Sequence, residues 1–291
     1  MQMSMRRLSS GKKIVAPYED PGNLSVSMKI NASITRLAGA QNNLQNSISF
    51  LEVQDGILAS AATIITRMNE LKGLASQDPM KSSQDIASYD DEFRDLQVQL
   101  YQMSGETFNG VSLFANYGIN GAESVFRDAR TNNTVSVHTS SDGATGSKIS
   151  LHKSALLAAL TLRSDTLAAA AFSTANNSAT AGAASVFSFA ATSSSNGMTL
   201  DKVSAGVFDK ALSNVAFLRA QMGGSMSRVT IASENIARQK TNLSAAQSRL
   251  MDIDIAEETA RMAKYSVLIQ AGAAMLSQAN SSSDIALLLL R

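Results

Sequence analysis

The sequence predicts a mainly α protein in which long N- and C-terminal helices pack antiparallel as a coiled-coil rod, with a small β-containing outer insert rich in Ala, Ser and Thr. Apolar residues recur at alternating spacings of three and four near both ends of the 291-residue chain. This period is typical of amphipathic helices that pack on one another. All three prolines lie at or before Pro79, so no proline interrupts the C-terminal pattern.

The N-terminal pattern predicts one long helix followed by a shorter one. We expect the polar members Gln41 and Asp55 to fix the register of the long helix against its partner. Asp78-Pro79 predicts its end, and a second stripe over 93–103 predicts a helix that ends near Gly105. The first stripe consists of Ile34, Leu37, Gln41, Leu44, Ile48, Leu51, Asp55, Leu58, Ala62 and Ile65.

The C-terminal pattern predicts a second long helix with Thr199 as its N-cap. Gly223 and Gly224 lie inside it and cost about 1 kcal/mol each relative to alanine, yet the register holds on both sides. The stripe consists of Phe208, Leu212, Val215, Arg219, Met222, Met226, Val229, Ser233, Ile236, Lys240, Leu243, Gln247 and Leu250.

Beyond Leu250 the pattern continues as a face made mostly of alanine, which permits close approach of helices but buries little area. The chain then closes on the apolar run 285–290. An end this apolar requires a partner to cover it, so we predict an assembly surface. The predicted assembly residues are Ile253, Ala256, Ala260, Ala263, Val267, Ala274, Ile285, Leu288 and Leu289.

The middle of the chain has a different composition. Residues 124–139 predict two short strands around an Asn132-Asn133 turn. The Ala-, Ser- and Thr-rich stretch 154–199 contains few charges and predicts a small packed unit that faces solvent. The resulting predicted segments are 1–30 (N-terminal segment), 31–115 (N-terminal half of the rod), 116–153 (hairpin part of the rod), 154–198 (insert), 199–250 (C-terminal half of the rod) and 251–291 (C-terminal helix).

Composition and residue spacing argue against most kinds of catalytic, metal-binding and ligand-binding site. The absence of cysteine excludes disulfides, thiolate metal sites and a cysteine nucleophile. His138 and His152 have no metal-ligand partner at a recognised spacing, and the lysine of 143–148 (GATGSK) follows the serine, which is the wrong order for a phosphate loop. The net charge of +1 without a basic block argues against nucleic-acid binding. We expect no cofactor, no signal peptide and no membrane segment.

An acidic cluster near the C-terminus raises the question of catalysis. Asp252, Asp254, Glu257 and Glu258 could supply paired carboxylates to a hydrolase or lyase, or bind a cation. The spacing instead favours a Glu257–Arg261 ion pair one helical turn apart on a solvated face. We therefore predict that the chain is not an enzyme.

The two ends of the chain resemble bacterial flagellins. Residues 7–14 (RLSSGKKI), 19–22 (EDPG) and 108–114 (FNGVSLF) are similar to family segments in the N-terminal half. Residues 242–254 (NLSAAQSRLMDID) are similar to the C-terminal signature, and 270–272 (QAG), 278–280 (QAN) and the Leu-rich end follow it. The likeness covers 6–115 and 198–291. It implies that 1–30 is a partial N-terminal core segment and spoke, that 154–198 is a variable outer insert, and that 251–291 is a C-terminal core helix.

The resemblance implies a structural subunit of the bacterial flagellum that serves motility. It implies unfolded type III export, secretion to the outside of the cell, and self-assembly into a helical filament, with termini that fold on assembly. The implied partners are further copies, hook-associated and cap proteins, and an export chaperone on the C-terminal segment. A hook-filament junction protein is the alternative, because such proteins are similar at both ends and often carry a proline after the paired acids, as at Asp20-Pro21.

Two departures from the family pattern concern particular positions. Few residues precede the RLSSG segment, where the family has a longer amphipathic stretch. The part recognised by an innate immune flagellin receptor corresponds to Arg67 and Leu71, but Thr66 and Gln99 stand where the family has Gln and Glu.

Overall fold

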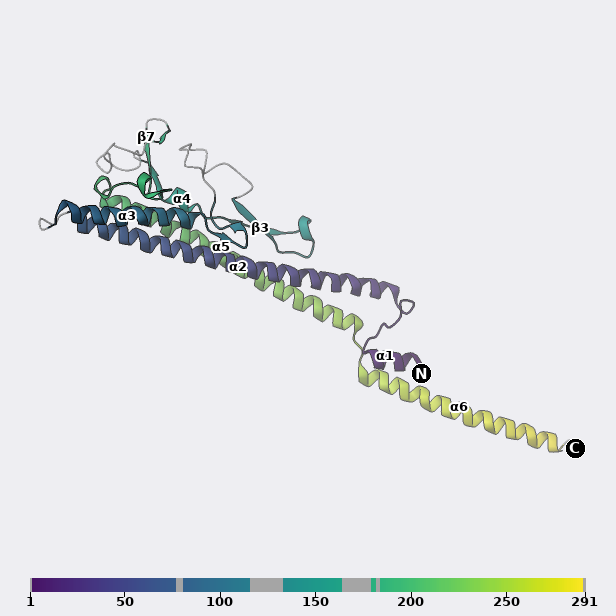
Figure 1. Cartoon of the computed structure of the whole chain (residues 1–291). Helices are drawn as coiled ribbons and strands as arrows, with labels where there is room; N and C mark the ends of the chain where they lie inside the picture. Colours follow the sequence, from purple (N-terminus) through teal and green to yellow (C-terminus); the bar gives the residue numbers. More distant parts are fainter. Residues whose placement is uncertain (1, 77–80, 116–132, 164–178, 182–183, 290–291) are drawn as a thin grey trace. The chain divides into compact units, whose positions relative to one another are not determined.

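The computed structural model describes residues 2–76, 81–115, 133–163, 179–181 and 184–289, most of them helical (Figure 1). The chain divides into a terminal unit, Met1–Gly39 with Ala237–Arg291, and a central unit, Ala40–Ile236. The predicted mainly α fold is confirmed. The helices are α1 (Gln2–Ser10), α2 (Pro21–Ser76), α3 (Ser83–Ser104), α4 (Leu156–Ala159), α5 (Ala205–Met251) and α6 (Ile255–Leu289).

Within the central unit, α2 and α5 lie side by side and run antiparallel, as predicted (Figure 1). Arg219 Nε on α5 donates to Asp55 Oδ1 on α2 at 2.8 Å. Farther along α2, Lys72 Nζ donates to the Leu200 carbonyl at 2.9 Å, just before α5 begins. Residue numbers therefore rise along α2 while those of its partners fall.

The predicted α2 stripe is half right. Its line Leu37, Leu44, Leu51, Leu58 and Ile65 is at most 1% exposed, but Gln41, Ile48, Asp55 and Ala62 are only half-buried. The second buried line lies one residue earlier and consists of Ala40, Ser47, Gln54, Ala61 and Met68.

The segment that follows α3 explains the shift of the second line in α2. Gln54 Nε2 donates to the Leu113 carbonyl at 2.9 Å, so this side of α2 faces chain beyond α3 as well as α5. The second buried line therefore lies three residues after the first, as from Leu37 to Ala40, and not four residues after it, as from Leu37 to Gln41. Gln54 is fully buried in this line, whereas Asp55, which the sequence pattern placed in the stripe, is only half-buried.

The same shift occurs in α5. Phe208, Val215 and Met222 are buried as predicted. The predicted Leu212 is 37% exposed, and Ala211 is buried in its place. The predicted Arg219 is exposed, and Leu218 is buried in its place. The insert covers this side of α5. Asn214 Nδ2 donates to the Ala159 carbonyl on α4 at 3.0 Å, and the Ser154 hydroxyl contacts the Met222 sulfur at 3.0 Å.

The start of the second long helix differs from the prediction. α5 begins at Ala205, and Thr199 precedes only a short 3₁₀ turn, Leu200–Lys202, without a side-chain capping bond. Val203 is extended (φ −110°, ψ 129°) and 1% exposed. Burial of Val203 in this extended conformation separates the 3₁₀ turn from the helix.

Short strands complete the central unit. Strands β1 (Thr107–Phe108) and β2 (Val111–Ser112) form a hairpin, and its turn places Asn109 at φ 49° and Gly110 at φ 77°, which suits an Asn-Gly pair. Strand β3 (Thr134–His138) pairs antiparallel with β4 (Lys148–His152). A third sheet has the order β5 (Thr161–Arg163), β7 (Ala184–Ser188), β6 (Ala179–Ala181).

The second strand of the predicted pair over 124–139 is present as β3, and its pairing with the predicted first strand stays a prediction. β3 pairs with β4 across a turn that contains Gly143–Thr145, and this partner lies on the C-terminal side of β3. Residues 124–132 lie outside the described residues. Asp78-Pro79 does too, although α2 ends at Ser76 and α3 ends at Ser104 with Gly105 as its C-cap.

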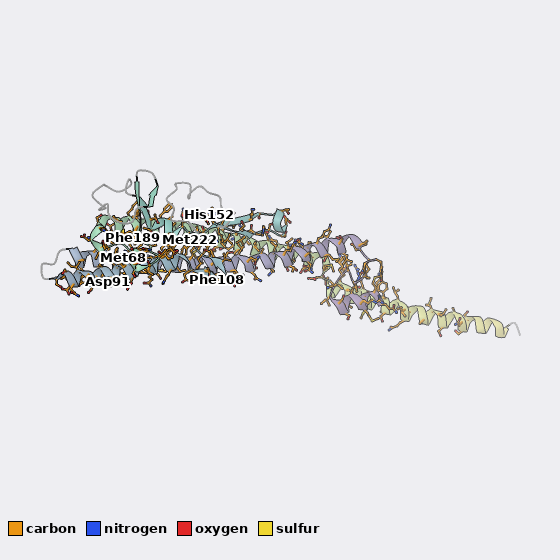
Figure 2. All side chains as sticks on the ribbon, turned by 45° about the horizontal axis from the view of Figure 1, so that its top comes forward. Met68, Asp91, Phe108, His152, Phe189 and Met222 are labelled. Carbon is orange, nitrogen blue, oxygen red and sulfur yellow. The ribbon has the colours of Figure 1, made fainter. Side chains whose placement is uncertain are left out.

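An aromatic and polar cluster ties α3 to the insert. The Phe208 ring lies 6.0 Å from that of Phe93 and 5.1 Å from that of Phe189. The fully buried Gln97 donates from Nε2 to the Met198 carbonyl at 3.0 Å and accepts from the Met198 amide at 2.9 Å. Figure 2 shows Phe189 in the same region of the central unit as Met68 and Met222.

Among the described helices, α2 contains a window with a mean hydropathy of 1.4 that is long and apolar enough to cross a membrane. About 33% of this window is buried. We interpret α2 as a core helix, because its buried residues follow two adjacent heptad lines and the helix carries the paired Asp55 and Arg67.

Candidate assembly interface

The C-terminal helix α6 starts at a well-defined cap. Asp254 Oδ1 accepts hydrogen bonds from the backbone amides of Ala256 at 2.9 Å and Glu257 at 3.2 Å. A carboxylate here satisfies amides that have no partner within the helix and interacts favourably with the helix dipole. α1 lies beside the first turns of α6 (Figure 1), where Glu258 is buried and Met262 is half-buried.

Most of α6 beyond these turns is exposed. Between Ala263 and Ser282 every described side chain except the half-buried Ser266 is exposed. Monomeric proteins rarely present so much contiguous apolar surface, and a helix that is apolar on several sides is normally buried in a larger body. The large apolar side chains are Tyr265, Val267, Leu268, Ile269, Met275 and Leu276, of which Met275 is 73% exposed.

The predicted assembly residues lie on this helix or at its base. Ala256, Ala260, Ala263, Val267 and Ala274 are all exposed, and Ile253 is half-buried. The backbone of Ile285, Leu288 and Leu289 belongs to α6, but their side chains lie outside the described ones. Whether these residues contact other copies stays a prediction.

Sequence reasoning missed a second side of α6. At about 100° per residue, Tyr265, Ile269 and Leu276 lie on the side that continues from Glu258 and Met262, away from the alanine line. The spacing of 262, 265, 269 and 276 carried this signal, but the regular alanine pattern obscured it. α6 therefore presents an alanine line on one side and bulky apolar residues on another.

A backbone clasp joins the two ends of the chain. Lys12 and Asp252 form an antiparallel bridge, in which the Lys13 amide donates to the Met251 carbonyl at 2.6 Å and the Ile253 amide donates to the Gly11 carbonyl at 3.3 Å. Gly11 has φ 69°, a conformation that glycine adopts without strain. The clasp brings together the RLSSG and SRLMDID segments.

The acidic cluster has structural roles. Asp254 caps α6, and Glu257 pairs with Arg261 at 2.6 Å, as the spacing predicted. Asp252 contributes backbone to the clasp. Within the described residues no group of three or more His, Asp or Glu side chains could hold a metal ion. His138 and His152 lie at opposite ends of the β3–β4 ladder.

The two positions that correspond to the immune-receptor site behave differently. Arg67 is exposed and donates to both oxygens of Glu92, at 2.9 and 3.3 Å, and to Glu70 at 3.3 Å. Its bonds to Glu92, followed by those to Glu70, raise the pKa of Arg67 above its ordinary value. Leu71 is fully buried. The carboxylate opposite Arg67 is that of Glu92, not a residue at position 99.

Two family models match the chain. Residues 1–118 match the bacterial flagellin N-terminal helical region, and residues 205–290 match the bacterial flagellin C-terminal helical region. Together they cover both helical ends, and the unmatched stretch between them contains most of the strand-bearing insert.

Curated relatives align over nearly the whole chain. The flagellar filament 31.3 kDa core protein of Treponema maltophilum is 30% identical, with 99% of this chain and 91% of that protein covered. Flagellin FlaB2 of Treponema pallidum and the flagellin of Bacillus subtilis are each 29% identical, with 100% of this chain and 92% of each relative covered.

A crystal structure of Bacillus cereus flagellin, 19% identical, covers 71% of this chain and 94% of its own, with a TM-score of 0.42. The family models and the relatives both extend across the residues that form the clasp, α2, α5 and α6. The chain therefore belongs to the bacterial flagellin family, the structural proteins that build the extracellular filament of the bacterial flagellum.

Proposed function

We propose that this filament subunit polymerises through α6, which neighbouring copies bury on more than one side. The observation that carries the proposal is the apolar surface of α6, where Val267 is 62% and Leu276 is 66% exposed. Burial of apolar area supplies about 25 cal/mol per Å², so contact between copies recovers free energy that the single chain leaves unused.

The alanine line supports close helix packing in the polymer. Small side chains at Ala256, Ala260, Ala263 and Ala274 allow backbones to approach, while Tyr265, Ile269 and Leu276 fill space on another side. Since α6 gains its apolar contacts from other copies, its final packing forms together with the filament. This is folding coupled to assembly.

Charge substitutions on the two sides of α6 test the proposal. Val267→Asp and Leu276→Asp should leave the circular dichroism of the monomer unchanged, because both side chains are exposed there. Both should abolish filaments in electron micrographs, because a carboxylate buried without a partner is strongly unfavourable.

The matched controls keep the side chains apolar. Val267→Ile and Leu276→Met should polymerise like the parent chain. If both aspartate variants formed filaments at the parental protein concentration, α6 would not be the assembly surface.

The same exposed surface supports further partners. Before polymerisation an export chaperone that covers α6 would prevent premature association, and hook-associated and cap proteins would contact the subunits at the two ends of the filament. A Leu276→Asp chain that bound such a chaperone as tightly as the parent does would contradict a chaperone site over Leu276.

The hook-filament junction alternative has a simple discriminating experiment. The relatives named above are flagellins and filament core proteins, and nothing in the structure favours the junction protein. Purified chain should form long homopolymers in electron micrographs, whereas a junction protein would form short rings or remain monomeric.

A further inference from the structure

The terminal unit contains a charged cavity of about 190 Å³ at the clasp. Four segments line it: the end of α1, the connection to α2, the first turn of α2 and the end of α5. The charged lining residues are Arg7, Lys13, Glu19, Asp20 and Arg249. All of them belong to the same compact unit.

The two carboxylates of this cavity have partners within the chain. Glu19, whose side chain is 7% exposed, accepts from Arg7 Nη2 at 3.0 Å. Asp20 accepts from the backbone amide of Asn23 at 2.9 Å and from its side-chain amide at 2.6 Å. These bonds, and secondarily the nearby Lys13 charge, lower the pKa of Asp20, so it is ionised near neutral pH.

The cations of the cavity are not balanced in the same way. Arg7 Nε is buried and has no hydrogen-bond partner. Lys13 and Arg249 form no side-chain hydrogen bond or ion pair with the part of the chain that the structure describes. Three cations against two carboxylates leave an excess positive charge, together with one N–H group that lacks an acceptor.

We infer that this cavity binds a carboxylate side chain of a neighbouring copy in the filament. Guanidinium and ammonium groups from three segments line the cavity and match the charge and hydrogen-bonding geometry of a carboxylate. Because the whole chain carries a net charge of only +1, a polymer of identical copies balances this local excess with carboxylates exposed elsewhere on its own surface. The inference rests on the proposed polymerisation.

Zero-length cross-linking tests the contact and identifies which acidic residue enters the cavity. A carbodiimide activates a carboxylate as an O-acylisourea, Lys13 Nζ attacks the activated carbonyl, and an amide forms as the urea leaves. Filaments grown from a mixture of heavy-nitrogen-labelled and unlabelled full-length chains should yield mixed-isotope peptides that join Lys13 to an Asp or Glu. Mass spectrometry identifies them, and unpolymerised chains should yield none.

Two variants complete the experiment. Lys13→Arg keeps the charge but removes the reactive amine, so filaments should form and the cross-link should disappear. Arg249→Gln should raise the critical concentration roughly fivefold at low salt and less at high salt. Arg228→Gln, an exposed residue on the same helix, makes the same charge change and should have little effect.

Several results would overturn the inference. Filaments in which Lys13 links only to Asp20 or Glu19 of its own chain, or to nothing, would show that no neighbour reaches the cavity. If no cross-link between chains formed, and millimolar inorganic phosphate protected Lys13 of unpolymerised chains from acetylation, the cavity would hold a free anion instead. The proposed role of α6 in polymerisation is tested by a different result. It would fail if the Val267→Asp and Leu276→Asp chains assembled normally, whatever Lys13 links to.

Discussion

Buried amide side chains connect α2 and α3 to distant segments of the central unit. Gln97 pairs with both backbone groups of Met198, whereas Gln54 makes one bond to Leu113 and leaves its own Oε1 without a partner. Both side chains are fully buried. A buried polar group without a partner costs free energy, so the two residues should differ in their contribution to stability.

Replacement of each amide by methionine should reveal this difference. Gln97→Met leaves the Met198 amide and carbonyl without partners and should lower the free energy of unfolding by about 2–4 kcal/mol. Gln54→Met leaves the Leu113 carbonyl without its hydrogen-bond donor but also removes the unpaired Gln54 Oε1. The loss of unfolding free energy should therefore be smaller, about 1 kcal/mol. Urea denaturation of the monomer measures both. Equal losses would contradict the assigned pairing.

The Asp55–Arg219 pair gives a pH dependence of known sign. The bond from Arg219, reinforced by its charge, lowers the pKa of Asp55, although partial burial opposes the shift. A carboxylate with a lowered folded-state pKa stabilises the protein above its unfolded pKa of about 4, and this contribution is lost as pH falls through the folded pKa.

Asp55→Asn should therefore be less stable than the parent at about pH 7 and closer to it at about pH 3. The difference at neutral pH should stay below about 1 kcal/mol, because both side chains of the pair are partly exposed to solvent. Urea midpoints at the two pH values provide the measurement, and Arg219→Gln is the partner control. A gap that widened in acid would contradict the assignment.

At the scale of elements, the sequence pattern predicts the long helices but places one face of each incorrectly. Burial of Leu44 and Val215 is predictable because apolar residues repeat every seven positions along one line. The choice between Ala61 and Ala62, or Ala211 and Leu212, depends on which neighbour covers the helix. The heptad pattern does not contain that information, since the insert and the segment after α3 supply the cover through tertiary contacts.

The ends of elements and the charged cavity were predictable to different degrees. Glu257 and Arg261 are one turn apart, so their ion pair follows from local geometry. The clasp between Lys12 and Asp252 and the cavity beside it join opposite ends of the chain. A local sequence pattern cannot predict a contact between segments so far apart in the sequence. The RLSSG and SRLMDID motifs indicated the family but not the contact between them.

The N-cap of α6 connects an element boundary to assembly. Asp254→Ala removes the acceptor for the amides of Ala256 and Glu257 and should cost about 1 kcal/mol of helix stability. Hydrogen exchange at these two amides should accelerate, and the critical concentration for polymerisation should rise. Asp254→Asn keeps an acceptor and should largely preserve both properties. Unchanged exchange in the alanine variant would show that the cap contributes nothing.

At the scale of the whole molecule, the division into two units predicts that assembly and core stability separate. Removal of residues 282–291 touches neither α3 nor the buried lines of the central unit. The truncated chain should keep its helical circular dichroism and its urea midpoint but form no filaments by electron microscopy. Filaments from this variant would show that the Leu-rich end has no role in polymerisation.

The clasp makes folding of the terminal unit depend on residues from both helical ends of the chain. Its two segments, around Lys12 and around Asp252, are far apart in the sequence, so the bridge forms only after the chain as far as Ile253 is available. The central unit has no such requirement, because its contacts end before Ala237. A chain that stopped before Asp252 could fold its central unit but could not form the clasp. Such a fragment would lack a complete terminal unit, and the proposed assembly surface on α6 with it.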